Sequence, residues 1–406
     1  MPSTLTTLTA APHRTMFFAG MAGLFATSLW WTLHLVARHA GIPLWALQLQ
    51  IAPIWAHALP LLFTVLPCFV FGFLFTTFPR WMNGPQVPRS VYCVAGPALL
   101  GATLTWLAAV QFDARLGLLA VGLAVLGLVV GLVALLRVLI EAQNLVSHAV
   151  VALIAIAVGV VAALGFGWGL AAGEDAALHF AVRAGLWGFL LPVFFAVCHR
   201  MVPFFSQGPI PGYVAWRPLW VLVAVVGLCW ARLLLGAFGE LRPLPVLDAA
   251  LTLLTALCAW RWTDRRARGT PLLWTLYVGV AWLPVAMLLQ TVRDTSYLVT
   301  GEWLLGRAPV HALTIGMFAS LLVAMVTRVT MGHSGRPLYM DRLTLGVFLT
   351  VQFAALARVC SELAHSPGMV VIALLAAVAL WLAAITVWTG RFAPLYLAPR
   401  IDGRPG

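Results

Sequence analysis

The sequence predicts an all-α membrane protein with about twelve transmembrane helices, and three observations lead to this prediction. Hydrophobic residues make up 62% of the 406-residue chain and charged residues only 9%, whereas roughly a quarter of the residues of a soluble domain are charged. Apolar stretches recur along the whole chain. The connections between them are short, so we expect no sizeable soluble domain.

Each predicted helix is an apolar stretch long enough to cross about 30 Å of hydrocarbon, which takes about 20 residues. Proline and glycine mark most of the joints, as in "WMNGPQVPRS" and "SQGPIPGYVAWRP". The polar residues at the N-terminus lack the basic region of a cleaved signal peptide, so the first helix should stay in the membrane. The predicted helices cover residues 16–38, 53–78, 91–110, 115–139, 146–171, 178–202, 216–238, 245–262, 271–292, 309–331, 342–362 and 368–390.

The basic residues, all of them arginine, set the predicted orientation. Of the 24 arginines, 16 lie in the terminal segments, in the even-numbered loops or at the helix ends that adjoin those loops. Cytoplasmic loops carry such an excess of basic residues, so we expect a cytoplasmic segment over 1–15, a twelve-helix domain over 16–390 and a cytoplasmic tail over 391–406. The net charge of +12 then faces an anionic leaflet, and no nucleic acid partner is expected.

The second, sixth and tenth predicted helices share a pattern, because each opens on a histidine and closes on an arginine. Their spacing of four helices suggests three four-helix units around a pseudo-threefold axis. This arrangement resembles the haem-copper oxidases at the level of the fold alone, and short apolar repeats also arise by chance. The paired residues are His57 and Arg80, His179 and Arg200, and His311 and Arg328.

One group of histidines lies at the predicted outer ends of the helices. Histidine inside a membrane is costly and usually faces a bundle interior or a cavity, and imidazole is a common ligand of haem iron and copper. His57 and His311 lie at matching depth and in similar local sequence, so they could flank one haem b, with His34 and His179 nearby. The alternative is that each histidine bonds a carbonyl or bridges helices.

A second group of ionisable residues lies at the predicted inner ends. His311 and His333 are 22 residues apart, or about 33 Å of helix, so they cannot share one metal. The inner histidines could bind copper, and the arginines could bind a carboxylate or another anion. The alternatives are interfacial anchoring by the arginines and a surface loop around His333. The members of the inner group are His13, His199 and His333, with Arg200, Arg328 and Arg336 in supporting positions.

Four motifs resemble the NnrS family. The segment "HALTIGMFASLLVAMVTRVTMGHSGRPL" at 311–338 resembles its most diagnostic motif, a His-Ala-Leu-Thr helix that ends in Gly-His-x-Gly-Arg-Pro-Leu. "HRMVPFFS" at 199–206, "GFLFTTFPRW" at 72–81 and "APHRTMFFAG" at 11–20 are similar to its other signatures. The resemblance covers the chain from residue 11 to at least 340.

The resemblance implies a bacterial inner-membrane protein associated with haem, copper and protection from nitric oxide and nitrosative stress. It implies a metal or haem role for His311, His57, His199 and His333. Many members carry Trp-His-Ala-His-Glu at the start of the second helix, whereas this chain has "WAHALP" at 55–60. The missing second histidine and glutamate put a two-metal site on that motif in doubt.

The residues and the resemblance together predict a membrane-embedded haem protein, with copper as a further metal, that binds or converts a small gas such as nitric oxide. A metal-dependent oxidoreductase stays open, because no electron-donor docking motif is found. The competing class is a multi-span transporter or metal permease. Transporters favour broken helices at midplane and two related halves, whereas the ionisable groups singled out above cluster at the two faces.

Overall fold

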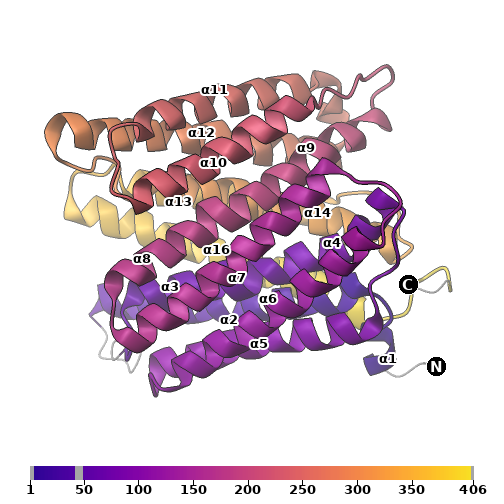
Figure 1. The fold of residues 1–406 in the computed structure, drawn as a ribbon, viewed down its shortest axis with the longest axis horizontal. Helices are drawn as coiled ribbons and strands as arrows, with labels where there is room; N and C mark the ends of the chain where they lie inside the picture. Colours follow the sequence, from indigo (N-terminus) through magenta and orange to yellow (C-terminus); the bar gives the residue numbers. More distant parts are fainter. Residues whose placement is uncertain (1–3, 42–48, 404–406) are drawn as a thin grey trace. The chain divides into compact units, whose positions relative to one another are not determined.

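The computed structural model describes residues 4–41 and 49–403 and is helical throughout its regular elements (Figure 1). Within these residues, twelve helices are long and apolar enough to cross a membrane. The predicted all-α fold with about twelve spans is therefore confirmed. Residues 1–3 and 404–406, which belong to the predicted terminal segments, lie outside the described residues.

The chain divides into two compact units. Unit 1 comprises Met1–Val193, His333–Gly335 and Thr389–Gly406. Its helices are α1 (Thr4–Leu8), α2 (Pro12–Ala40), α3 (Pro53–Pro60), the π-helical η2 (Leu61–Val65), α4 (Leu66–Met82), α5 (Arg89–Gln111), α6 (Leu116–Ile140), α7 (Ser147–Ala172), α8 (Asp175–Arg183) and the π-helical η3 (Ala184–Leu190).

Unit 2 comprises Phe194–Gly332 and Arg336–Trp388. Three of its helices, α9, α14 and α16, have one end in unit 1. Its helices are α9 (Leu191–Gln207), α10 (Leu219–Ala237), α11 (Leu244–Trp262), the 3-10 helix η4 (Arg265–Gly269), α12 (Pro271–Thr300), α13 (Ala308–His311), the π-helical η5 (Ala312–Ala319), α14 (Ser320–His333), α15 (Arg342–Ser361) and α16 (Pro367–Leu397).

The predicted boundaries hold to within a few residues, except where a helix runs on through polar residues. The first span begins at Pro12 rather than residue 16, so His13 and Arg14 lie in its first turn. The ninth span ends at Thr300 rather than 292, and the last at Leu397 rather than 390. Helices continue past the apolar stretch because long polar side chains reach out from the hydrocarbon to water.

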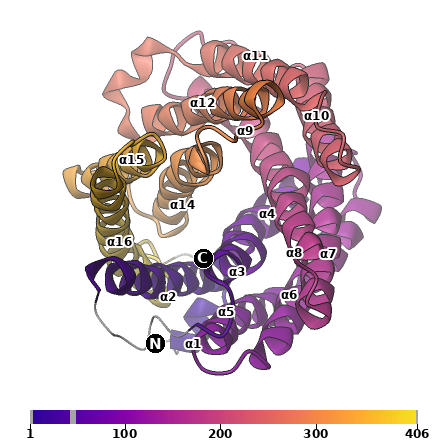
Figure 2. The ribbon, with the colours of Figure 1, turned by 90° about the vertical axis from the view of Figure 1, so that its left-hand side faces the viewer.

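In unit 1, α5, α6 and α7 lie side by side, and α2 packs on α4 and α5 (Figures 1 and 2). Close packing rests on small residues, which let helices approach without a hydrophobic force to drive them together in lipid. Gly159 of α7 faces the Phe189 ring, and a Cβ added there would lie 2.6 Å from it. Gly127 of α6 faces Leu99 of α5 at the same close range.

In unit 2, α10, α11 and α12 pack in succession (Figures 1 and 2), and η5 packs on both α12 and α15. Gln352 joins α15 to α12 and to the start of α14, because its Oε1 accepts from Trp282 Nε1 at 2.8 Å and its Nε2 donates to Ser320 Oγ at 2.7 Å. Such bonds between helices are the usual role of polar side chains in membrane spans.

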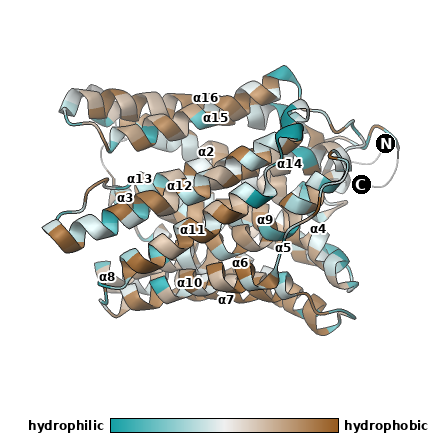
Figure 3. Ribbon diagram, turned by 90° about the horizontal axis from the view of Figure 1, so that it is seen from above, coloured by the Kyte–Doolittle hydropathy of each residue, from teal (hydrophilic) through white to brown (hydrophobic). Residues whose placement is uncertain are grey.

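The hydropathy of the chain follows the spans. Hydrophobic residues cover most of each long helix, whereas hydrophilic residues gather at helix ends and in the connections (Figure 3). This distribution is the one that a bilayer requires of a multi-pass protein.

The second, sixth and tenth spans share two features that the sequence pattern did not specify. Each contains a π-helical segment close after its histidine: η2 follows His57, η3 follows His179 and η5 follows His311. They are also the most buried spans, with 89%, 72% and 78% of their most apolar residues buried against 61% or less elsewhere. The three helices are thus related, but the 4+4+4 arrangement is not confirmed.

Replacing Gly159 with valine should destabilise unit 1. The new side chain would overlap the Phe189 ring, and overpacking of this kind costs about 1–3 kcal/mol. Thermal unfolding of the purified protein in detergent measures the effect. Gly165→Val is the matched control on the same helix, since nothing lies within 4 Å of a Cβ there. Equal unfolding temperatures for the two variants would contradict the close contact.

Candidate functional site

The outer histidines of unit 1 lie among tryptophans, as their aromatic-rich sequence context predicts. The His57 ring stacks on Trp31 with centroids 4.3 Å apart, and Trp31 also contacts His34 at 5.5 Å. His179, an exposed residue, meets the Trp55 ring edge-on at 4.7 Å. The structure therefore brings His57 and His34 to one aromatic wall of α2 and α3.

His311 has the hydrogen bond that orients a metal-binding imidazole. Its Nδ1 lies 3.0 Å from the backbone oxygen of Arg307. A carbonyl oxygen can only accept, so Nδ1 carries the proton and the lone pair of the neutral ring is on Nε2. Metal-ligating histidines usually donate their other ring N–H to such a carbonyl, which fixes tautomer and orientation.

The predicted pairing of His57 with His311 stays a prediction, because the two residues belong to different units. Each is the only histidine of its span before the π-helical segment. π-Helical turns inside α-helices are rare and frequently mark functional sites. His57 lies four residues before η2 and His311 directly before η5, so both residues precede an unusual feature of the backbone.

At the other end of the tenth span, the structure brings together two of the three inner histidines. The rings of His13 and His333 lie 4.3 Å apart at a 40° tilt. His13 is 3% exposed, and its Nδ1 has no hydrogen-bond partner in the described part of the chain. This contact joins residues that are remote in sequence, and the role predicted for the inner group stays a prediction.

Unit 1 holds this histidine pair in place through its C-terminal segment. Arg14 donates from Nη1 to the backbone oxygens of Tyr396 (3.1 Å) and Ala398 (2.8 Å). The backbone N–H of Ile401 donates to the oxygen of Ser334 at 3.2 Å. The charges of Arg80 and Arg400 also act on both imidazoles, so the pair lies in a cationic environment.

The remaining inner residues lie in unit 2 and have structural partners. His199 is fully buried, with Nε2 3.2 Å from the backbone oxygen of Pro218. Arg328 stacks over the Phe205 ring at 4.3 Å. Arg200 is half-buried near Arg217, and the backbone N–H of Arg336 donates to the oxygen of Met331.

A hydrogen bond near His199 also holds the connection between α9 and α10. Tyr213 donates to the backbone oxygen of Trp262 at 3.1 Å, and the Trp262 ring contacts His199 edge-on. Burial raises the pKa of Tyr213 above its ordinary value, so the phenol stays protonated and keeps this donor at neutral pH.

A cluster of three or more metal-ligating side chains is not found among residues 4–41 and 49–403. Such a cluster would consist of histidine, cysteine, aspartate or glutamate side chains.

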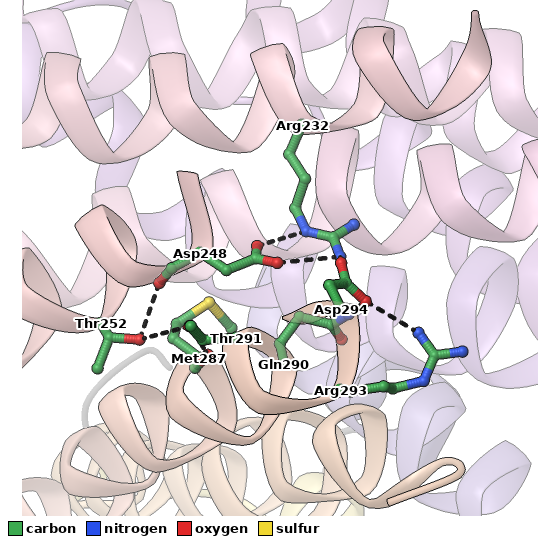
Figure 4. Close-up of polar contacts among 8 residues, drawn as sticks. All are labelled: Arg232, Asp248, Thr252, Met287, Gln290, Thr291, Arg293 and Asp294. Carbon is green, nitrogen blue, oxygen red and sulfur yellow. Dashed lines mark hydrogen bonds and ion pairs between the residues drawn. The ribbon is translucent and has the colours of Figure 1, made fainter. Parts of the chain in front are cut away.

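Sequence reasoning missed a buried charge network in unit 2 (Figure 4). Arg232 of α10 donates from Nε to Asp248 Oδ1 at 2.6 Å and from Nη2 to Asp294 Oδ2 at 2.5 Å. Gln290 donates to Asp294 Oδ1 at 2.7 Å, and Arg293 lies 3.4 Å from the same oxygen. Opposite charges alternate from Asp248, which is fully buried, to Arg293, which is partly exposed.

The network links α10, α11 and α12, and each arginine in it is paired with an aspartate. An unpaired charge in the membrane interior is very costly, whereas a paired and hydrogen-bonded one is tolerated. The sequence signal for this network is the presence of opposite charges near the ends of neighbouring apolar stretches. The predicted helix over 271–292 stops before Asp294, whereas α12 continues to Thr300 and places Asp294 on a buried helix face.

Comparison with known proteins supports the motif resemblance. The family model described as "NnrS protein" matches residues 7–400. All four motifs, at 11–20, 72–81, 199–206 and 311–338, fall within the matched region. No curated protein matches the chain.

Replacing Arg232 with alanine should destabilise the protein strongly, because Asp248 and Asp294 would lose their shared partner. Breaking a buried pair by removing one member costs about 3–5 kcal/mol. Unfolding in detergent at neutral pH measures the change.

Arg137→Ala is the matched control, since Arg137 pairs with Glu141 on an exposed helix face. An exposed pair contributes at most about 1 kcal/mol. Similar unfolding midpoints for Arg232→Ala and Arg137→Ala would show that the network does not hold the three helices.

Proposed function

The chain belongs to the NnrS family, and on that basis we propose that it is a membrane-embedded haem protein that binds or converts nitric oxide at a histidine-ligated metal. Its twelve spans place it in contact with the lipid bilayer. The proposal includes a bacterial inner-membrane location with both termini in the cytoplasm, in keeping with the arginine distribution, and copper as a further metal.

The observation that carries the proposal is the hydrogen bond from His311 Nδ1 to the Arg307 backbone oxygen. It leaves Nε2 as the nitrogen with the lone pair that binds iron, and such a bond also raises ligand basicity. The π-helical η5 starts at the next residue. A widened turn directly after a candidate ligand is the kind of departure from regular helix that functional sites show.

His57 supports the proposal as a second imidazole ligand. Its ring stacks on Trp31, and a half-buried imidazole in an apolar, aromatic wall suits a porphyrin face. Haem iron held by one imidazole, or copper, would supply an open coordination position for a diatomic gas, whereas at iron held by both imidazoles the gas would have to take the place of one of them. The protein residues would orient the imidazole and keep water away, and a small apolar gas enters from the lipid.

For copper, the proposal uses His13 and His333. Neutral imidazole suits copper, the two rings are in contact, and the Nδ1 of His13 has no hydrogen-bond partner among the described residues. His199 is a further candidate ligand. The competing proposal is an anion or carboxylate held by Arg200, Arg328 or Arg336.

The visible absorption spectrum of protein purified after expression with ample haem and copper tests this proposal. We expect a Soret band that shifts in nitric oxide, and we expect both His311→Ala and His57→Ala to shift or remove it. Each substitution deletes a proposed axial ligand.

His365→Ala is the control, because His365 is an exposed loop residue, and its spectrum should match the wild type. A protein without a Soret band or bound copper would contradict the proposal and favour a transporter. Unchanged spectra in both ligand variants would contradict the residue assignment.

A further inference from the structure

The turn that leads from α12 to α13 has an unusual backbone. Leu305 has φ 66° and Gly306 has φ 43°, both in the left-handed region. For a bulky residue such as leucine this conformation is a genuine outlier. Strain of this kind persists only where the surrounding structure over-determines the backbone, and it clusters at functional sites.

One anchor of this turn is Ser296, in the last helical turns of α12. Its Oγ accepts from the backbone N–H of Leu304 at 3.2 Å, and its one proton is shared between the backbone oxygens of Arg293 at 2.7 Å and Glu302 at 3.1 Å. A single side chain thus binds both a donor and an acceptor of the turn. The first half of the turn is fixed to α12.

Trp303 strengthens this anchor and ties it to the buried charge network. Its ring stacks on Tyr297 with centroids 4.0 Å apart at 9°, and the Arg293 guanidinium lies 4.2 Å above it. Arg293 is also the outermost member of the network in Figure 4, where it pairs with Asp294. The charges that join α10, α11 and α12 therefore also hold the turn.

Glu362, directly after the last residue of α15, packs against the second half of the turn. Its carboxylate lies directly against Gly306, where any larger residue would place a Cβ. A negative charge at a helix C-terminus is unfavourable, but Arg358 offsets it by pairing with Glu362 Oε1 at 2.6 Å. Only glycine combines this close contact with the positive φ.

The turn ends on the carbonyl that orients His311. The backbone oxygen of Arg307 accepts from the backbone N–H of His311 at 3.1 Å and from its Nδ1 at 3.0 Å. The backbone N–H of Ala308 closes the turn on the Leu305 oxygen at 2.8 Å. The position of the turn therefore fixes both the start of the tenth span and the tautomer of its imidazole.

We propose that Gly306 and Glu362 are positioning residues for His311, acting through the Arg307 carbonyl. They set the turn so that His311 is protonated at Nδ1 and presents Nε2. Only the binding of iron by His311 Nε2 rests on the proposed function. The effect of Gly306 and Glu362 on the tautomer of His311 does not depend on it. The ligand would be held at a fixed orientation by an anchored turn.

Solid-state nitrogen NMR of haem-free protein labelled with nitrogen-15 histidine tests the inference directly. The His311 signals are those that His311→Ala removes. In the wild type at neutral pH, we expect protonated Nδ1 and unprotonated Nε2. In Gly306→Ala and in Glu362→Gln we expect a mixture of His311 rings protonated at Nδ1 and at Nε2, because the Arg307 carbonyl moves away from the His311 ring.

Glu302→Gln is the matched control: the residue lies in the same turn, but its hydrogen bonds run through its backbone. It should retain the wild-type signals. A wild type protonated at Nε2, or a single Nδ1–H form that persists in both Gly306→Ala and Glu362→Gln, would overturn the inference.

The haem-loaded protein separates this inference from the proposed function. With haem bound, both positioning variants should weaken metal retention by about 10–100-fold, as loss of an outer hydrogen bond to a ligand does. A missing Soret band together with the expected tautomer shifts would refute the haem proposal alone. A normal Soret band with unchanged tautomers and retention in both variants would refute the positioning role alone.

Discussion

The hydrocarbon core of a membrane offers no water to backbone N–H and C=O groups, and the whole fold follows from that constraint. Every span must satisfy its own hydrogen bonds, which is why the regular structure of residues 4–41 and 49–403 is helical. Departures from the α-helix then need a reason. The three π-helical segments lie in the three most buried spans, each close after a histidine. They widen the helix without exposing backbone to lipid, since the hydrogen bonds are kept with a longer register.

The same constraint governs charge. Arg232 shares its guanidinium between Asp248 and Asp294, so each of these buried side chains has a hydrogen-bonded partner. Through Arg293 and Trp303 the network reaches the turn that bears the Arg307 carbonyl. Interactions that hold the helices of unit 2 together are thus continuous with those that orient His311. Mutations far from the imidazole can therefore alter its geometry, which is expected where a ligand is fixed by outer hydrogen bonds.

The parts of the fold that depend on local sequence were predictable. Apolar length located twelve spans among the described residues. Features that depend on tertiary neighbours were not predictable. The sequence around Leu305 does not predict its left-handed backbone, and the neighbouring residues of the turn meet Ser296 and Glu362, which lie in α12 and directly after α15. Asp294 resembled a loop residue until α12 was seen to continue to Thr300. The stacking of His57 on Trp31 joins two spans and has no local signal.

The central claim is that His311 presents Nε2 to an iron atom, and X-ray absorption at the iron edge tests it most directly. Rigid imidazole rings give multiple-scattering features that reveal histidine ligation of the metal. The account predicts such features for iron in the wild-type protein and their weakening or loss in His311→Ala. Iron without imidazole scattering, or identical spectra for the wild type and His311→Ala, would contradict it.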